Sequence, residues 1–112
     1  MSTADQRYDE AIALQQAGKL DEAVARLEAL ASDEPDFVLV HAALSVFYSK
    51  QGRHDEAVRH AKRVCELDPD DPFSYMALSI TCHKAGRLSE AEEAMAMAID
   101  KQWEARRKSA GG

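Results

Sequence analysis

The sequence predicts an all-α protein built from three stacked helix-turn-helix repeats. One short segment occurs three times, as Gly18-Lys-Leu-Asp-Glu-Ala23, Gly52-Arg-His-Asp-Glu-Ala57 and Gly86-Arg-Leu-Ser-Glu-Ala91. Its glycines are 52 − 18 = 34 and 86 − 52 = 34 residues apart. A fixed period of this size is typical of repeat proteins, in which each unit buries its apolar face on the next unit. Apolar residues recur at helical spacing and no segment alternates with period two, so strands are not expected.

The helices can be placed from breakers and capping residues. Thr3 and Gln6 have the spacing of a capping box for the first helix, and Pro72 after Asp71 suits the first turn of the fifth. The six predicted helices cover residues 3–17, 21–32, 37–51, 55–67, 72–85 and 89–107.

The glycine of each repeated segment should end the first helix of its pair, because glycine readily adopts the positive φ that satisfies the last carbonyl groups. Three residues later stands a side-chain oxygen that could cap the second helix. The predicted caps are Asp21, Asp55 and Ser89, and Glu92 gives Ser89 the spacing of a capping box.

The totals exclude several kinds of protein. A chain of 112 residues predicts one domain, and the net charge of −6 argues against a nucleic-acid partner. No stretch approaches the roughly 20 apolar residues of a membrane span, and the N-terminus lacks the apolar segment of a signal peptide. The two cysteines lack CxxC spacing, which fits a reducing compartment. We therefore expect a cytoplasmic protein that binds neither nucleic acid nor membrane.

Further motifs accompany the 34-residue period and the Gly-x-x-x-Glu-Ala segment: Glu66-Leu67-Asp68-Pro69, Leu44-Ser45-x-x-Tyr48 and Leu78-Ser79-x-x-Cys82. Together they resemble the tetratricopeptide repeat (TPR) family. The resemblance implies a right-handed α-α superhelix. Trp103 stands where the family has a proline, so we expect the last helix to extend to about Lys108. The resemblance implies a single domain over residues 1–108, with repeats at about 4–37, 38–71 and 72–105, and a flexible tail over 109–112.

The resemblance also implies a concave groove lined by the first helix of each pair, which would bind an apolar peptide or amphipathic helix of a partner protein. The helices over 37–51 and 72–85 are apolar on two sides, so each has a second surface to cover. Simple packing between the inner helices is the competing explanation. The expected groove residues are Tyr8, Ile12, Leu39, Ala42, Val46, Lys50, Phe73, Met76, Ile80, His83 and Lys84.

One ligand of TPR proteins is disfavoured by this sequence. Chaperone-binding members hold a C-terminal carboxylate with Lys, Asn and Arg side chains, and the corresponding positions here are Tyr8, Ile12, Ala43, Phe73 and Ala77. None of these side chains can hold a carboxylate by charge or by an amide. Lys50 and Lys84 at the edge leave weaker recognition of acidic segments open.

Self-association is the alternative function, through the groove or through the C-terminal helix. Trp is common among interface anchors, and the expected oligomer contacts are Ile99, Trp103 and Arg106. The same stretch could instead be a frayed helix end whose basic tip favours the helix dipole.

No catalytic motif is present, so we expect neither an enzyme nor a cofactor. The sequence lacks a glycine-rich phosphate loop, Gly-x-Ser-x-Gly and His-Glu-x-x-His. The histidines show no metal-ligand spacing, and we expect the cysteines to be buried free thiols. These residues are His41, His54, His60, His83, Cys65 and Cys82.

Overall fold

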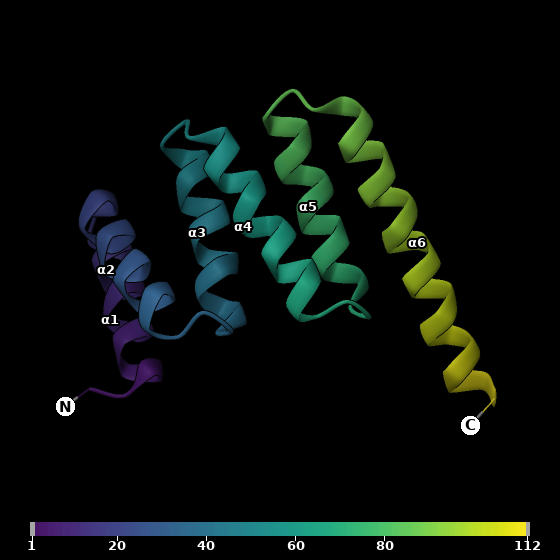
Figure 1. The fold of residues 1–112 in the computed structure, drawn as a ribbon, viewed down its shortest axis with the longest axis horizontal. Coiled ribbons are helices and arrows are strands. Elements are labelled where there is room, and N and C mark those ends of the chain that lie inside the picture. The colour runs from purple at the N-terminus through teal and green to yellow at the C-terminus, as the bar shows by residue number, and fades with distance from the viewer. Residues whose placement is uncertain (1, 112) are drawn as a thin grey trace.

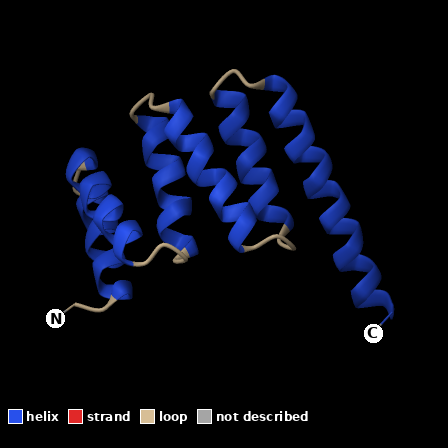
Figure 2. Ribbon diagram, in the orientation of Figure 1, coloured by secondary structure: helices blue, strands red, loops and turns tan. Residues whose placement is uncertain are grey.

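The computed structural model describes residues 2–111 and consists of six consecutive α-helices joined by short turns (Figures 1 and 2). Within this range it contains no strand, which confirms the all-α prediction. The helices are α1 (Ala4–Gln16), α2 (Leu20–Asp33), α3 (Val38–Lys50), α4 (His54–Leu67), α5 (Pro72–Lys84) and α6 (Leu88–Gly111).

The helices stack in the order of the chain. Each packs against the next, and α3 also contacts α5, so the first helices of the second and third pairs are neighbours. The stack measures 45 × 35 × 22 Å, and Figure 1 shows α1 and α2 at one end and α6 at the other. The first helices of the second and third pairs therefore share one side of the stack.

The three glycines act as predicted. Gly18, Gly52 and Gly86 have φ angles of +81°, +76° and +77°, while no other residue type in residues 2–111 has a positive φ. After Gly52, the amide of Arg53 donates to the carbonyl of Tyr48 at 2.8 Å. This bond satisfies a carbonyl at the end of α3, as left-handed glycine caps do.

The predicted caps of the second helices were wrong. Helices α2, α4 and α6 begin one residue before the expected cap, and the amide of Ala23 already bonds the carbonyl of Lys19 at 3.0 Å. The turn after each glycine leads the chain directly into the helix, with one residue between them. The side chains of Asp21 and Asp55 lie in first turns, where a negative charge favours the helix dipole.

Two other caps follow the sequence. Gln6 N donates to Thr3 Oγ1 at 3.1 Å, and Thr3 N donates to Gln6 Oε1 at 2.8 Å, which completes the capping box. Asp71 caps α5 by accepting from Phe73 N at 2.9 Å. Both ends therefore form from local side-chain chemistry.

Helix α6 runs further than predicted. It reaches Gly111, so residues 109–111 are helical where a flexible tail was expected, and Gly112 lies outside the described residues. No proline or glycine occurs between Leu88 and Ala110, so nothing in this segment breaks the helix.

The core lies between the two helices of each pair and between successive pairs. One cluster joins the first two pairs and includes Leu27, Leu30, Val40 and Leu44, each with none of its surface exposed. A smaller cluster joins Val58 of α4 to residues of α5 and α6. The fold thus buries its apolar residues in layers along the stack.

Candidate functional site

The first helices of the second and third pairs carry a row of exposed apolar side chains. Leu39 and Val46 of α3 are 52% and 51% exposed, and Phe73 and Ile80 of α5 are 68% and 55% exposed. All four were predicted groove residues. They lie on adjacent helices, and the opposite sides of these helices supply core residues such as Leu44 and Cys82.

A pocket of about 240 Å³ opens between α3, α4 and α5. Four predicted groove residues line it: Ala42, Val46, Ile80 and Lys84. Its other apolar walls include Ala61 and Val64 of α4 and Ala77 of α5.

Two of the four hydroxyl groups around this pocket donate hydrogen bonds within the protein. Ser45 Oγ donates to the carbonyl of Ala42 at 2.8 Å, and Thr81 Oγ1 donates to the carbonyl of Ala77 at 2.8 Å. These bonds turn the hydroxyl hydrogens toward the backbone. Lys84 is the charged residue of the lining.

The remaining predicted groove residues differ in exposure. Tyr8 and Ile12 are half-buried and pack against the core cluster, and the Tyr8 ring lies 5.9 Å from the ring of Phe37. Burial raises the pKa of Tyr8, with Asp9 adding to the shift. Met76 is also half-buried, whereas Lys50, His83 and Lys84 are exposed. The exposed apolar row is therefore centred on α3 and α5, and α1 contributes little to it.

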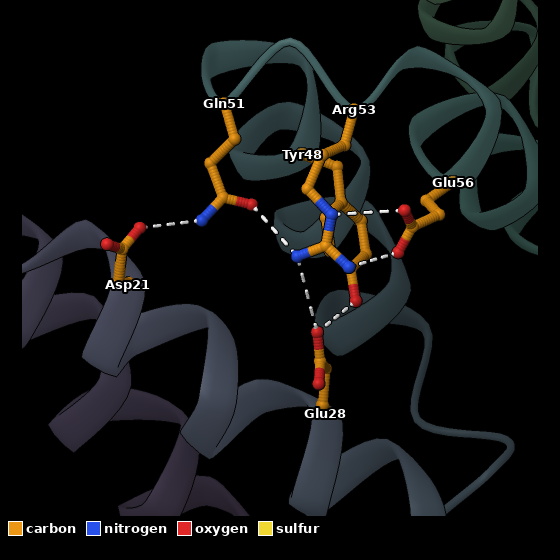
Figure 3. Close-up of polar contacts among 6 residues, drawn as sticks. All are labelled: Asp21, Glu28, Tyr48, Gln51, Arg53 and Glu56. Atoms are coloured by element: carbon orange, nitrogen blue, oxygen red, sulfur yellow. Dashed lines mark hydrogen bonds and ion pairs between the residues drawn. The ribbon is translucent and has the colours of Figure 1, made fainter.

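A polar network fixes the first pair of helices against the second (Figure 3). The Tyr48 hydroxyl of α3 donates to the carboxylate of Glu28 on α2, and the Arg53 guanidinium lies 4.5 Å from the centre of the Tyr48 ring. Burial and the Glu28 carboxylate both raise the pKa of Tyr48.

The same network continues along the turn after α3. Arg53 pairs with Glu56 of α4, and Gln51 Nε2 donates to Asp21 of α2 at 2.9 Å (Figure 3). These bonds link residues as much as 30 positions apart. They hold the junction between the first two repeats, and no motif in the sequence indicates them.

A histidine pair also went unpredicted. His41 Nδ1 lies 3.0 Å from His60 Nδ1, and His41 Nε2 lies 2.7 Å from the carbonyl oxygen of Pro35. Because a carbonyl only accepts, His41 carries its proton on Nε2 and its Nδ1 accepts from His60. Burial, then the charges of His41 and Arg59, lower the pKa of His60 to about 4.

The structure places this pair at the interface of α3 and α4. Within residues 2–111 no group of three or more His, Cys, Asp or Glu side chains could hold a metal ion. The pair connects the two helices of one repeat, and its ring centres are 5.2 Å apart.

Cys65 and Cys82 are free thiols and both are buried. Burial raises the pKa of Cys65 to about 11, and it also raises the pKa of Cys82. Cys65 Sγ donates to the carbonyl of Ser74 at 3.4 Å, so the thiol faces α5. Neither thiol has the lowered pKa of a reactive cysteine.

The predicted oligomer contacts lie on α6, away from the pocket lining. Ile99 is 47% exposed and Trp103 is 57% exposed. The Arg106 guanidinium lies 5.5 Å from the centre of the Trp103 ring, a cation–π distance. This surface is separate from the exposed row on α3 and α5.

Across residues 2–111, none of the helices combines the length and the apolar character that a membrane crossing requires.

Solved structures with the same arrangement of helices are numerous. A crystal structure of MamA superposes with a TM-score of 0.84 at 17% identity, covering 94% of this chain and 61% of that one. YrrB, described as a TPR protein with an unusual peptide-binding site, gives a TM-score of 0.79 at 20% identity, covering 91% of this chain and 53% of that one. This chain thus spans about three-fifths or less of the length of these two proteins.

A third structure is the second TPR of Spaghetti (RPAP3) bound to the HSP90 peptide SRMEEVD. It gives a TM-score of 0.75 at 18% identity, covering 86% of this chain and 89% of that one. At these identities the likeness shows the fold. No curated protein sequence matches this chain.

Two sequence models described as tetratricopeptide repeat match the chain, one over residues 8–72 and one over residues 48–105. They overlap in the second repeat and together span all three repeats that the glycine period defines. The chain therefore belongs to the tetratricopeptide repeat family.

Proposed function

We propose that this chain is a non-catalytic binding module that holds an apolar segment of a partner protein against α3 and α5. The observation that carries the proposal is the exposed row of Leu39, Val46, Phe73 and Ile80 beside an apolar pocket. Contiguous apolar surface of this kind commonly marks an interface. TPR proteins in general are interaction modules, and YrrB and RPAP3 are described with a peptide-binding site or a bound peptide.

The pocket favours one kind of ligand. An aliphatic or aromatic side chain would fill the space between Val46, Ala77 and Ile80, and a neighbouring carboxylate would lie near Lys84. A short helix or extended segment with apolar anchors meets both requirements. Tails that depend on a clamped C-terminal carboxylate fit less well, because Phe73 and Ala77 offer no positive charge.

A peptide library displayed on phage tests this proposal. Peptides selected on the wild-type protein should carry apolar anchors with acidic neighbours, and one of them can be synthesised with a fluorescent label. Its anisotropy should report binding to the wild type and a loss of at least about tenfold in affinity for Ile80→Glu, because the new carboxylate occupies the apolar pocket.

Leu88→Glu is the matched control, since Leu88 is 57% exposed and Ile80 is 55% exposed, but Leu88 lies on α6 outside the pocket. This control should bind the peptide as the wild type does. Selected peptides that bind both variants equally would show that the site lies elsewhere.

A further inference from the structure

Within residues 2–111 the outer face of α6 has no covering helix, whereas the equivalent face of α4 is covered by α5. In α4, Val58, Ala61 and Cys65 are only 1%, 3% and 7% exposed, and Cys65 bonds the backbone of α5. The α6 residues 34 positions later are Glu92, Met95 and Ile99, since 58 + 34 = 92, 61 + 34 = 95 and 65 + 34 = 99. Among residues 2–111 no further helix covers this face, and Figure 1 shows α6 at the end of the stack.

Five residues form one stripe on this face, which we call the α6 stripe: Glu92, Met95, Ile99, Trp103 and Arg106. Their spacings of 3, 4, 4 and 3 residues place them along one side of a helix. Met95, Ile99 and Trp103 are 38%, 47% and 57% exposed. The core face of α6 is separate, and it is made by the buried Ala91, Ala94 and Ala98.

The α6 stripe is symmetric about Ile99. Met95 and Trp103 lie four residues to either side, and the acidic Glu92 and basic Arg106 lie seven residues to either side. An antiparallel copy of the helix, crossing at Ile99, would therefore meet apolar residues with apolar residues and each charge with its opposite. A two-fold interface requires this kind of self-complementary surface.

We propose that a second copy of this chain covers the α6 stripe, in an antiparallel two-fold pair of α6 helices centred on Ile99. In this pair Ile99 packs on Ile99 of the second copy, Met95 packs on Trp103 and Glu92 pairs with Arg106. The contact spans roughly 21 Å of helix, because 14 steps of about 1.5 Å separate Glu92 from Arg106. Two single helices form a small interface, and small interfaces belong to weak or transient complexes, so we expect association at micromolar concentrations.

Head-to-tail stacking of copies is less favourable, because the opposite end of the molecule is polar. The α1 residues one period before the buried Val40 and Ala43 are Gln6 and Asp9, and both are exposed. They offer no apolar surface to Met95 and Ile99. Pairing of α6 with α6 of a second copy is therefore the better match. It leaves the pocket between α3, α4 and α5 free.

Light scattering on the purified chain at increasing micromolar concentration gives the first test. The mass should rise from one chain to two, and Ile99→Glu should remain a monomer with unchanged helical circular dichroism. A wild type that stays monomeric throughout overturns the proposal. So does a dimer that survives Ile99→Glu or that Ile80→Glu abolishes, because the contact then lies elsewhere.

A charge swap tests the register. Glu92→Arg and Arg106→Glu should each weaken self-association by about tenfold, since each creates two like-charged contacts per dimer. An equimolar mixture of the two variants should regain the wild-type affinity, because both charge pairs are then complementary. Glu93→Arg is the control, since it makes the same charge change outside the α6 stripe and should dimerise as the wild type does. Failure of the mixture to recover would contradict the antiparallel register.

Discussion

At the scale of single residues, the junctions between repeats differ even though their backbones repeat. Tyr48 holds Glu28 across the first junction, and the residue one period later is Cys82, since 48 + 34 = 82. The residue one period after Glu28 is Lys62, since 28 + 34 = 62, so the second junction has no counterpart of the Tyr48–Glu28 bond and carries an ion pair between Lys62 and Glu90 at 3.2 Å. Different side chains at two equivalent positions therefore change how neighbouring repeats are held together.

The histidine pair makes the stability of the fold depend on pH. The pKa of His60 is lowered from 6.5 to about 4 in the folded protein, so the unfolded chain binds the proton more readily. The free energy of unfolding should therefore be highest above about pH 6.5 and should fall as the pH drops toward about 4. Urea unfolding at several pH values measures this decrease.

His60→Gln should retain more of its stability over this pH range, because the residue that gains the proton on unfolding is gone. His83→Gln, at an exposed position, should show the wild-type decrease. An equal decrease in wild type and His60→Gln would show that His60 is not the responsible group.

Individual contacts of this kind were the least predictable part of the molecule. The sequence did not determine the surroundings of His41, and the structure buries this side chain. Nothing in the sequence indicated that His60, 19 residues away, would approach it at 3.0 Å. Such pairing depends on the crossing of α3 and α4, which the spacing of residues along each helix does not determine.

At the scale of helices, the repeated glycine is the residue that the turns most require. An added Cβ at Gly52 meets no atom within 4 Å, so the cost of Gly52→Ala comes from its φ of +76° alone. We expect the free energy of unfolding to fall by about 1–2 kcal/mol, the cost of left-handed backbone for an L-residue. Urea denaturation measures this loss.

Gly111→Ala is a suitable control, because Gly111 also has open space around its Cβ position but is not at positive φ. It should unfold at the same or a slightly higher urea concentration. A Gly52→Ala protein as stable as the wild type would contradict the role given to this turn.

Most helices could be located from the sequence, whereas some of their ends could not. Pro72 and the pair Thr3 and Gln6 placed two starts correctly, because their caps are local. The starts at Leu20 and His54 were missed, since a backbone turn after glycine begins these helices without a side-chain cap.

At the scale of the whole molecule, the second apolar side of α3 and α5 is what distinguishes this stack from a closed bundle. The sequence showed that these helices are apolar on two sides. It could not show that Met76 would be half-buried while Phe73 is 68% exposed, because this depends on how neighbouring helices overlap. Nor could it show that Tyr8 and Ile12 would pack against the core. The eleven groove residues expected from the sequence remain a prediction for the binding surface, and the exposed ones are centred on the second and third repeats.

The most direct test is whether the exposed apolar side of α3 and α5 belongs to the core. The measurement is the free energy of unfolding of the double variant Val46→Glu/Ile80→Glu. We expect the free energy of unfolding to stay within about 1 kcal/mol of the wild type, as for substitutions on a surface. Leu44→Ala, at a fully buried position on the same helix α3, provides the scale and should lose about 2–5 kcal/mol. If the double variant loses as much as Leu44→Ala, then Val46 and Ile80 belong to the core and the binding surface is wrongly assigned.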